Sequence, residues 1–377
     1  MAISPVELGQ LLAVFEEHFR TGEELGASVS VWWQGEEWLN EGRGWCEREE
    51  RRAWTSETLV PVYSATKGPA VATAMLALER HGLGLDDPVR EVWSGFPLQE
   101  ATFGDLFSHQ CGLAVLDRRV DIRDHAEVVA AIEAQQPAWR PGNGHGYHPR
   151  TFGALLDEPV RRLTGETLGH YWRDEMARPA GIDFWIGLPQ AEHARVAVLY
   201  PGRPQDGMEN DAFYREFNRA GSLTQRAFAS PGGLRSVREM NDPAAWSAGF
   251  PALGGVGTAA GLAKFYQLML GHVDGPLSRA AREAMIARRV DGEDLILQQP
   301  TAFGAGFQLD PLDATGQKIR RLYGASDMGF GHPGAGGSHG FADPSTGVSF
   351  AYVMNQMELS VMPGRRCQRL IDALMGA

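Results

Sequence analysis

A serine and a lysine stand three residues apart in the stretch VYSATKGPA, which runs from Val62 to Ala70. On a helix, positions i and i+3 share a face, so the amine of Lys67 can reach the hydroxyl of Ser64. A serine is a weak nucleophile until a base removes its proton. A lysine that is desolvated in a cleft can lose its own proton near neutral pH and act as that base. The pair therefore predicts nucleophilic catalysis by Ser64.

Lysine is rare in this chain. Lys67, Lys264 and Lys318 are the only lysines among the 35 basic residues, and all the others are arginines. Arginine can supply surface charge, but its guanidinium keeps its proton and cannot serve as a base. The choice of lysine at this position favours chemistry, although a solvated lysine beside a helix-start serine would give the same spacing.

Two further stretches have the composition of an active-site wall. WRPGNGHGYHPRTFG (Trp139–Gly153) places Tyr147 in a loop rich in glycine and proline ahead of a helix. FGHPGAGGSHGFADPSTGVSFAYVMN (Phe330–Asn355) follows Gly329, and the segment from Gly329 to Gly340 contains six glycines, both ends included, before a strand begins. Glycines allow a backbone to approach a bound ligand closely. Both stretches are therefore candidates for contact with a substrate.

Hydrophobic periodicity predicts the elements that hold these stretches in place. Strands are expected near both ends of the chain, and helices fill most of the segment between residues 64 and 181. The elements expected outside that segment are a helix over Pro5–Arg20, strands over Ala27–Gln34, Glu37–Gly44, Phe303–Asp310 and Gly347–Asn355, and helices over Gly261–Leu270 and Gly364–Met375.

This order of elements predicts an α/β (α+β) fold. An isolated hairpin is marginally stable in water, so the N- and C-terminal strands are expected to join one antiparallel sheet flanked by helices. We expect a sheet domain formed by residues 1–75 and 240–377 and a mostly helical domain formed by residues 76–239. A cleft between two domains is a usual place for an active site. The segment 201–242 is expected to be a loop at the rim of that cleft.

Composition limits the partners. The chain has 377 residues, a net charge of −12 and no basic stripe, so nucleic acid is not an expected partner. It has no apolar stretch of membrane-spanning length and no signal-peptide pattern at its start. Its three cysteines lack metal-ligand spacing and fit a reducing compartment. These features predict a soluble cytoplasmic protein without a membrane partner, and they leave the oligomeric state open.

Taken together, the motifs resemble those of the serine β-lactamase and penicillin-binding-protein superfamily, on its esterase branch. That branch is the family VIII carboxylesterases, which are similar to class C β-lactamases. Ser64-Ala-Thr-Lys67 matches the SxxK motif, Tyr147 takes the place of the tyrosine in Y-x-N, and His332-Pro333-Gly334 takes the place of K-T-G. The resemblance covers nearly the whole chain and implies a β-lactamase-like fold.

The resemblance also implies a mechanism of two-step acyl transfer. Ser64 would attack a carbonyl, Lys67 and Tyr147 would share the proton transfers, and the backbone N–H groups of Ser64 and Ala335 would hold the oxyanion. The implied activity is that of a carboxylesterase for short- to medium-chain esters, with a small-molecule substrate and no metal or organic cofactor. The residues expected to bind the substrate or shape its pocket are His332, Gly334, His148 and Trp139.

Two departures from the family motifs bear on the substrate. Pro149 stands where Y-x-N has its asparagine, and it has no side-chain donor for an amide. His332 replaces the lysine of K-T-G and carries less positive charge at neutral pH. Both departures favour an esterase. The alternatives are hydrolysis of β-lactams or D-amino-acid peptides, acyl transfer to an alcohol by the same residues, and a sensor that is acylated but hardly turns over.

Three competing motifs can be weighed against this hypothesis. Gly336–Gly340 matches the G-x-S-x-G elbow of α/β-hydrolases, but a strand is expected after Ser338 and the only later histidine is the adjacent His339. Gly329–Gly334 and Gly255–Ala260 fit dinucleotide-binding patterns, yet alternating βαβ units are absent. We expect Ser338 to be a loop residue near the cleft and expect no dinucleotide site.

Overall fold

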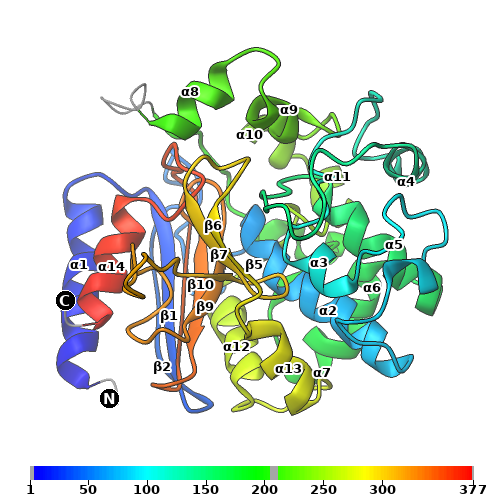
Figure 1. The fold of residues 1–377 in the computed structure, drawn as a ribbon. Coiled ribbons are helices and arrows are strands. Elements are labelled where there is room, and N and C mark those ends of the chain that lie inside the picture. Colours follow the sequence, from blue (N-terminus) through cyan, green and yellow to red (C-terminus); the bar gives the residue numbers. More distant parts are fainter. Residues whose placement is uncertain (1–3, 204–210, 376–377) are drawn as a thin grey trace.

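The computed structural model describes residues 4–203 and 211–375 (Figure 1). Its largest element is an eight-stranded antiparallel sheet with the order β2-β1-β11-β10-β9-β8-β7-β6. The strands are β1 (Gly26–Trp33), β2 (Glu36–Gly44), β6 (Val290–Glu293), β7 (Pro300–Phe303), β8 (Gln308–Leu309), β9 (Phe330–Pro333), β10 (His339–Asp343) and β11 (Val348–Met354). Because β1 pairs directly with β11, the expected single sheet formed by both ends of the chain is confirmed.

Helices cover both faces of this sheet, and strand β11 shows why. All its residues are buried, and successive side chains of a strand point to opposite faces. Phe350 and Tyr352 join the core that includes α1 and α14, whereas Ala351 and Val353 join the main core, where α12 crosses β1, β10 and β11 (Figure 1). The three helices are α1 (Pro5–Arg20), α12 (Ala259–Leu270) and α14 (Arg365–Met375).

The other helices lie mainly beyond the α12 face of the sheet, with the almost completely buried α2 among them (Figure 1). They are α2 (Lys67–Arg80), α3 (Phe103–Phe107), α4 (His125–Glu133), α5 (Phe152–Thr164), α6 (Leu168–Trp172), α7 (Arg178–Ala180), α8 (Ala212–Asn218), α9 (Leu223–Ala229), α10 (Val237–Met240), α11 (Pro243–Ala248) and α13 (Arg279–Ile286). A small sheet of order β3-β5-β4 joins β3 (Val60–Pro61), β4 (Phe184–Trp185) and β5 (Val256–Gly257). Within the two described ranges, no helix has the length and apolar character needed to cross a membrane.

Sequence periodicity predicted the outer elements to within two residues, but two expectations are wrong. The stretch 303–310 is not one strand: it divides between β7 and β8, because Gly306 takes a φ of 83° and Gly304 lies where a Cβ would be 2.3 Å from the Met285 carbonyl oxygen. The described part of 201–242 is not a simple loop, since it contains α8, α9 and α10; residues 204–210 of this expectation lie outside the described residues.

The two-domain division stays a prediction. The strands of the large sheet come from residues 26–44 and 290–354, both inside the expected sheet domain. The small sheet, in contrast, takes its strands from residues 60–61, 184–185 and 256–257, so it draws on both expected domains.

Candidate active site

The turn that carries Ser64 is fixed in a strained conformation. Ser64 begins a short 3₁₀ helix (Ser64–Thr66) that leads directly into α2. The preceding residue, Tyr63, has a φ of 49° and a ψ of −129°, a region that costs a residue with a side chain about 1–3 kcal/mol. The Thr66 hydroxyl accepts a hydrogen bond from the Gly255 amide at 2.8 Å and ties the turn to the residue just before β5. Ser64 is thereby held at the N-terminal end of a helix, where the helix dipole favours negative charge.

The amine of Lys67 contacts Ser64, as their spacing predicts. Lys67 is fully buried, and its Nζ lies 3.2 Å from Ser64 Oγ, 3.0 Å from the Pro149 carbonyl oxygen and 2.7 Å from the Ala252 carbonyl oxygen. Burial lowers the pKa of Lys67 well below its usual value, and the positive charge of Arg150 lowers it further. A neutral amine has two N–H groups and one lone pair. The two carbonyls accept the N–H groups, which leaves the lone pair for the proton of Ser64.

Tyr147 completes a group of three contacting side chains. The Lys67 Nζ lies 4.8 Å from the centroid of the Tyr147 ring, and the Tyr147 hydroxyl is hydrogen-bonded to the side chain of Ser64. Burial raises the pKa of Tyr147 above its usual value, and the hydrogen bond with Ser64 only partly offsets that rise. The phenol is therefore protonated at neutral pH and is placed to exchange a proton with the Ser64 oxygen.

Asp294 holds the loop that carries Tyr147. Its carboxylate is 1% exposed and accepts hydrogen bonds from the backbone amides of Tyr147 at 3.0 Å, Ile296 at 2.8 Å and Leu297 at 2.8 Å, and from the Thr301 hydroxyl at 3.0 Å. A carboxylate bound by several backbone amides acts as a fixed anchor for the segments that donate to it. Asp294 is therefore a positioning residue for Tyr147.

We expect Asp294→Ala to lower both stability and kcat. Each buried donor left without an acceptor costs about 1–3 kcal/mol, so the free energy of unfolding should fall by about 3 kcal/mol or more. The Tyr147 loop would also lose its anchor, so kcat should fall in the folded fraction. Urea unfolding and initial rates with a simple ester measure the two effects. Asp294→Asn keeps one carbonyl oxygen, so its stability and its kcat should lie between those of the wild type and of Asp294→Ala. If Asp294→Ala behaves like the wild type, Asp294 does not position Tyr147.

The backbone amides of Ser64 and Ala335 are free to bind an oxyanion. Within the described residues, neither amide donates a hydrogen bond, and both residues line the same pocket. The close approach of their two segments depends on Gly334, where a Cβ would lie 2.0 Å from the Val62 carbonyl oxygen. The structure therefore brings the two predicted oxyanion residues together through a glycine at the end of β9.

The pocket above Ser64 has a volume of about 480 Å³. Helices α8 and α9 supply much of its wall, so part of the segment expected as a rim loop does border the site, although as helices. Its lining residues are Tyr63, Ser64, Pro149, Arg150, Phe217, Asn218, Gln225, Phe228, Ala229, Leu234, Arg235, Leu253 and Ala335. The mixture of aromatic, aliphatic and polar side chains is typical of a small-molecule site.

None of the four residues expected to bind substrate is among the described residues that line this pocket. His332 is fully buried with its ring centroid 5.8 Å from that of Tyr147, and its Nδ1 donates to the Pro333 carbonyl oxygen at 2.8 Å. His148 donates from Nδ1 to the Gly146 carbonyl and accepts the Leu113 amide at Nε2.

Trp139 packs its ring 5.7 Å from that of His148. Gly334, the fourth of these residues, lies beside the turn that carries Ser64, since a Cβ on it would be 2.0 Å from the Val62 carbonyl oxygen. Direct contact between these four residues and a substrate stays a prediction, and the geometry of His332 fits an action through Tyr147.

Sequence patterns do not reveal two residues of this site, Asp294 and Arg150. Asp294 lies 147 positions from Tyr147 in a stretch without a motif, so no signal in the sequence indicates their contact. Arg150 is three residues after Tyr147, and a charged residue in that glycine- and proline-rich loop is the signal that could have marked it.

The competing motifs do not have the structural surroundings that their functions require. Strand β10, not a helix, begins directly after Ser338, which rules out a nucleophile elbow, and the Ser338 carbonyl accepts the Gly334 amide at 2.6 Å. Gly255–Ala260 spans the two-residue strand β5 of an antiparallel sheet, not a βαβ unit. Across residues 4–203 and 211–375, no three or more His, Cys, Asp or Glu side chains form a group that could hold a metal ion.

A model of the Beta-lactamase family matches residues 13–372, and the chain belongs to that family. It is 30% identical over 348 residues to the esterase/beta-lactamase LipL of Mycobacterium tuberculosis, an alignment that covers 88% of this chain and 77% of LipL.

Solved structures of other proteins have the same fold. A penicillin-binding protein homologue from Caulobacter crescentus superimposes with a TM-score of 0.84 at 32% identity, covering 99% of this chain and 98% of the homologue. A family VIII carboxylesterase superimposes with a TM-score of 0.85 at 30% identity, again covering 99% of this chain and 98% of the other. These findings confirm the resemblance and the β-lactamase-like fold, and they support activity as a serine hydrolase.

Proposed function

We propose that this protein is a carboxylesterase that cleaves short- to medium-chain esters through an acyl-enzyme on Ser64. The observation that carries the proposal is the buried Lys67 amine, 3.2 Å from Ser64 Oγ and with carbonyl acceptors for two of its N–H groups. Burial lowers the pKa of this lysine, and its neutral form is aligned to accept the serine proton.

The reaction would proceed in two halves. Ser64 Oγ bonds to the ester carbonyl carbon as its proton passes to Lys67, and the amides of Ser64 and Ala335 bind the oxyanion. Such donors contribute about 10²–10³ each to the rate. Collapse of the intermediate breaks the bond to the alcohol, which leaves with a proton from Lys67 or Tyr147. Water then attacks the acyl group, gives its proton to the same side chains and releases the acid, which restores the Ser64 hydroxyl.

The site favours an ester over a β-lactam. Burial lowers the pKa of His332 well below its usual value, so its ring is neutral where the family motif has an ammonium group. Pro149 has no side-chain donor, and its carbonyl already accepts from Lys67. Two of the contacts that a β-lactam would use are therefore missing, whereas a simple ester needs only the nucleophile, the base and the oxyanion donors.

Hydrolysis of p-nitrophenyl butyrate by the intact protein, with acid-quenched samples analysed by mass spectrometry, tests the proposal. We expect steady turnover and a butyryl group on the peptide that contains Ser64. Butyrylation of Ser64 without turnover would indicate a sensor. Butyrylation elsewhere, or neither turnover nor an adduct, would contradict the proposal.

A further inference from the structure

Arg150 is a buried cation without an acidic partner. Its side chain is 7% exposed and donates only to main-chain oxygens: Nε to Pro231 at 2.8 Å, Nη1 to Leu234 at 3.3 Å and Nη2 to Gly233. A guanidinium has five N–H groups, so two of them have no acceptor among the described residues. A buried charge that lacks a counter-ion is unfavourable, and an anion placed beside it would be bound strongly.

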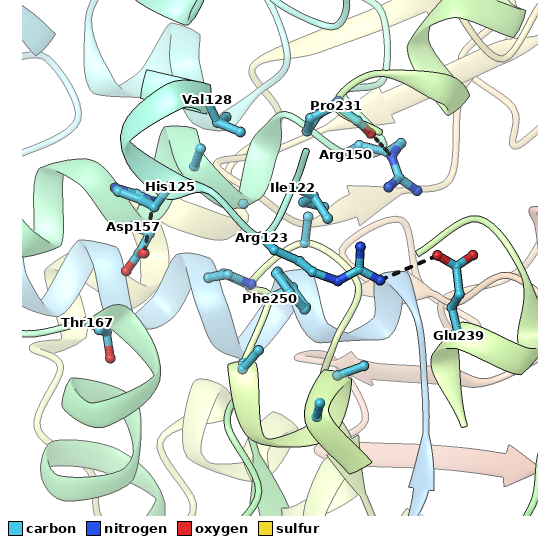
Figure 2. Close-up of a pocket in the computed structure, with 18 of the residues that line it drawn as sticks. Ile122, Arg123, His125, Val128, Arg150, Asp157, Thr167, Pro231, Glu239 and Phe250 are labelled. Atoms are coloured by element: carbon cyan, nitrogen blue, oxygen red, sulfur yellow. Dashed lines mark hydrogen bonds and ion pairs between the residues drawn. The ribbon is translucent and has the colours of Figure 1, made fainter. Parts of the chain in front are cut away.

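The nearest carboxylates are engaged elsewhere. Glu239 pairs with Arg123 at 3.4 Å and accepts the Leu234 amide at 3.0 Å, and Asp121 also pairs with Arg123, at 3.1 Å. Figure 2 shows this arrangement in a neighbouring pocket that Arg150 also borders: Glu239 reaches Arg123, while Arg150 bonds to a main-chain carbonyl. Both carboxylates attract Arg150 only at longer range.

The pocket that contains Ser64 is positively charged. Arg150 and Arg235 both line it, and no aspartate or glutamate is among the described residues of its lining. Arg235 donates from Nη2 to the Ala229 carbonyl at 2.7 Å and forms no ion pair within the described ranges. The chain as a whole has a net charge of −12. Two guanidinium groups without ion pairs in the pocket of Ser64 therefore have the opposite sign to the net charge of the protein.

We propose that this pocket selects esters that carry a carboxylate, which Arg150 and Arg235 bind while Ser64 attacks the ester carbonyl. This inference rests on the proposed esterase function. Arginine binds a carboxylate through paired N–H groups, and one N–H group on each of Nη1 and Nη2 of Arg150 has no acceptor among the described residues. Phe217 and Phe228 would cover the apolar chain between the ester and the carboxylate. Half-esters of dicarboxylic acids are the simplest substrates of this class.

Matched pairs of esters test the inference in the wild-type protein. On the acyl side, mono-p-nitrophenyl glutarate is compared with its methyl ester; on the alcohol side, 4-(butyryloxy)benzoate is compared with its methyl ester. After correction for uncatalysed hydrolysis, we expect kcat/KM to be about tenfold or more higher for the acid in at least one pair, as charge-assisted hydrogen bonds imply. Equal values in both pairs, or a preference for the neutral esters, would overturn the inference while leaving the esterase function intact.

Variants assign the preference to residues. Arg150→Gln and Arg235→Gln should each lower the acid-to-methyl-ester ratio of kcat/KM several-fold. The ratio is used because Arg150 also affects the pKa of Lys67, which changes the rate of both esters alike at one pH. Arg238→Gln is the matched control, since this exposed arginine three residues beyond Arg235 does not line the pocket. An unchanged ratio in Arg150→Gln and Arg235→Gln would contradict the assignment.

A binding measurement separates the two proposals. Sodium glutarate should raise the Tm of the wild type above that in sodium chloride of equal ionic strength, because a ligand that binds only the folded state stabilises it. The rise should be smaller in Arg235→Gln, which needs no change at a buried position. If no ester is turned over but this rise is found, the esterase proposal fails and the anion site stands. Without a rise and without an ester preference, the anion site fails.

Discussion

Replacing Ser64 with alanine should reduce hydrolysis of p-nitrophenyl butyrate by a factor of about 10⁴–10⁶. The variant keeps the backbone amides of Ser64 and Ala335, and Lys67 keeps its two carbonyl partners. It lacks only the atom that forms the acyl bond, so the reaction loses its covalent route while the oxyanion donors remain. Initial rates with purified protein measure the loss. Thermal unfolding should show a fold close to that of the wild type, because a single hydroxyl is removed.

Ser338→Ala is the matched control for this experiment. Ser338 is the serine of the competing G-x-S-x-G motif, is 1% exposed, and its hydroxyl has no hydrogen-bond partner within the described residues. Its removal should leave the rate near that of the wild type. Retained activity in Ser64→Ala would mean that another residue is the nucleophile. If only Ser338→Ala lost activity, Ser338 would be that residue.

Sequence periodicity predicts those parts of the fold that local burial determines. Helix α1 and strands β1, β2 and β11 follow their expected ranges closely. Helix α1 has buried residues about one turn apart, β1 and β11 are buried along most of their length, and β2 pairs with β1 across a tight turn. The division between β7 and β8 depends on tertiary contacts of Gly304 and Gly306, which a local pattern does not contain. Helices α8 and α9 are short, and their signals were the N-cap residues Asp211 and Ser222, which accept from amides of the first turn.

The same distinction applies to the site. Ser64 and Lys67 are one helical turn apart, so their contact follows from local geometry. Tyr147 could be placed only through the resemblance to a family, since periodicity does not bring residue 147 to residue 64. The roles of Asp294 and Arg150 depend on main-chain groups that tertiary folding delivers, and no pattern in one sequence predicts which carbonyls or amides meet a side chain.

Lys67 is the second residue whose replacement should have a large effect. Lys67→Arg introduces a permanent positive charge in place of a group that can give up its proton near neutral pH, and Lys67→Met keeps most of the length of the side chain without the nitrogen. If Lys67 is the base, both variants should lose about 10²–10⁴ in kcat/KM. The fully buried position has little room for a guanidinium. If Lys67→Arg does not fold, the test of Lys67 as the base rests on Lys67→Met. Substantial activity in Lys67→Arg would mean that a positive charge at this position is enough for activity and that Lys67 is not needed as a base.

The pH dependence distinguishes a base from a structural contact. Protonation occupies the lone pair that faces Ser64, so the neutral amine is the active form. In the wild type, kcat/KM should therefore rise with pH through the pKa of Lys67, which burial has lowered, and then level off. Lys67→Met should lose this rise as well as the rate. A structural role would lower the rate without changing the shape of the profile.

Lys264→Met provides the control, because Lys264 is also on a helix and donates to a backbone carbonyl, that of Gly181 at 3.2 Å, but lies outside the pocket. This variant should match the wild type in both rate and profile. If Lys67→Met keeps the rise with pH, another group removes the serine proton. Tyr147, hydrogen-bonded to Ser64, would then be the base, and because its pKa is raised, the rise would have to lie at alkaline pH.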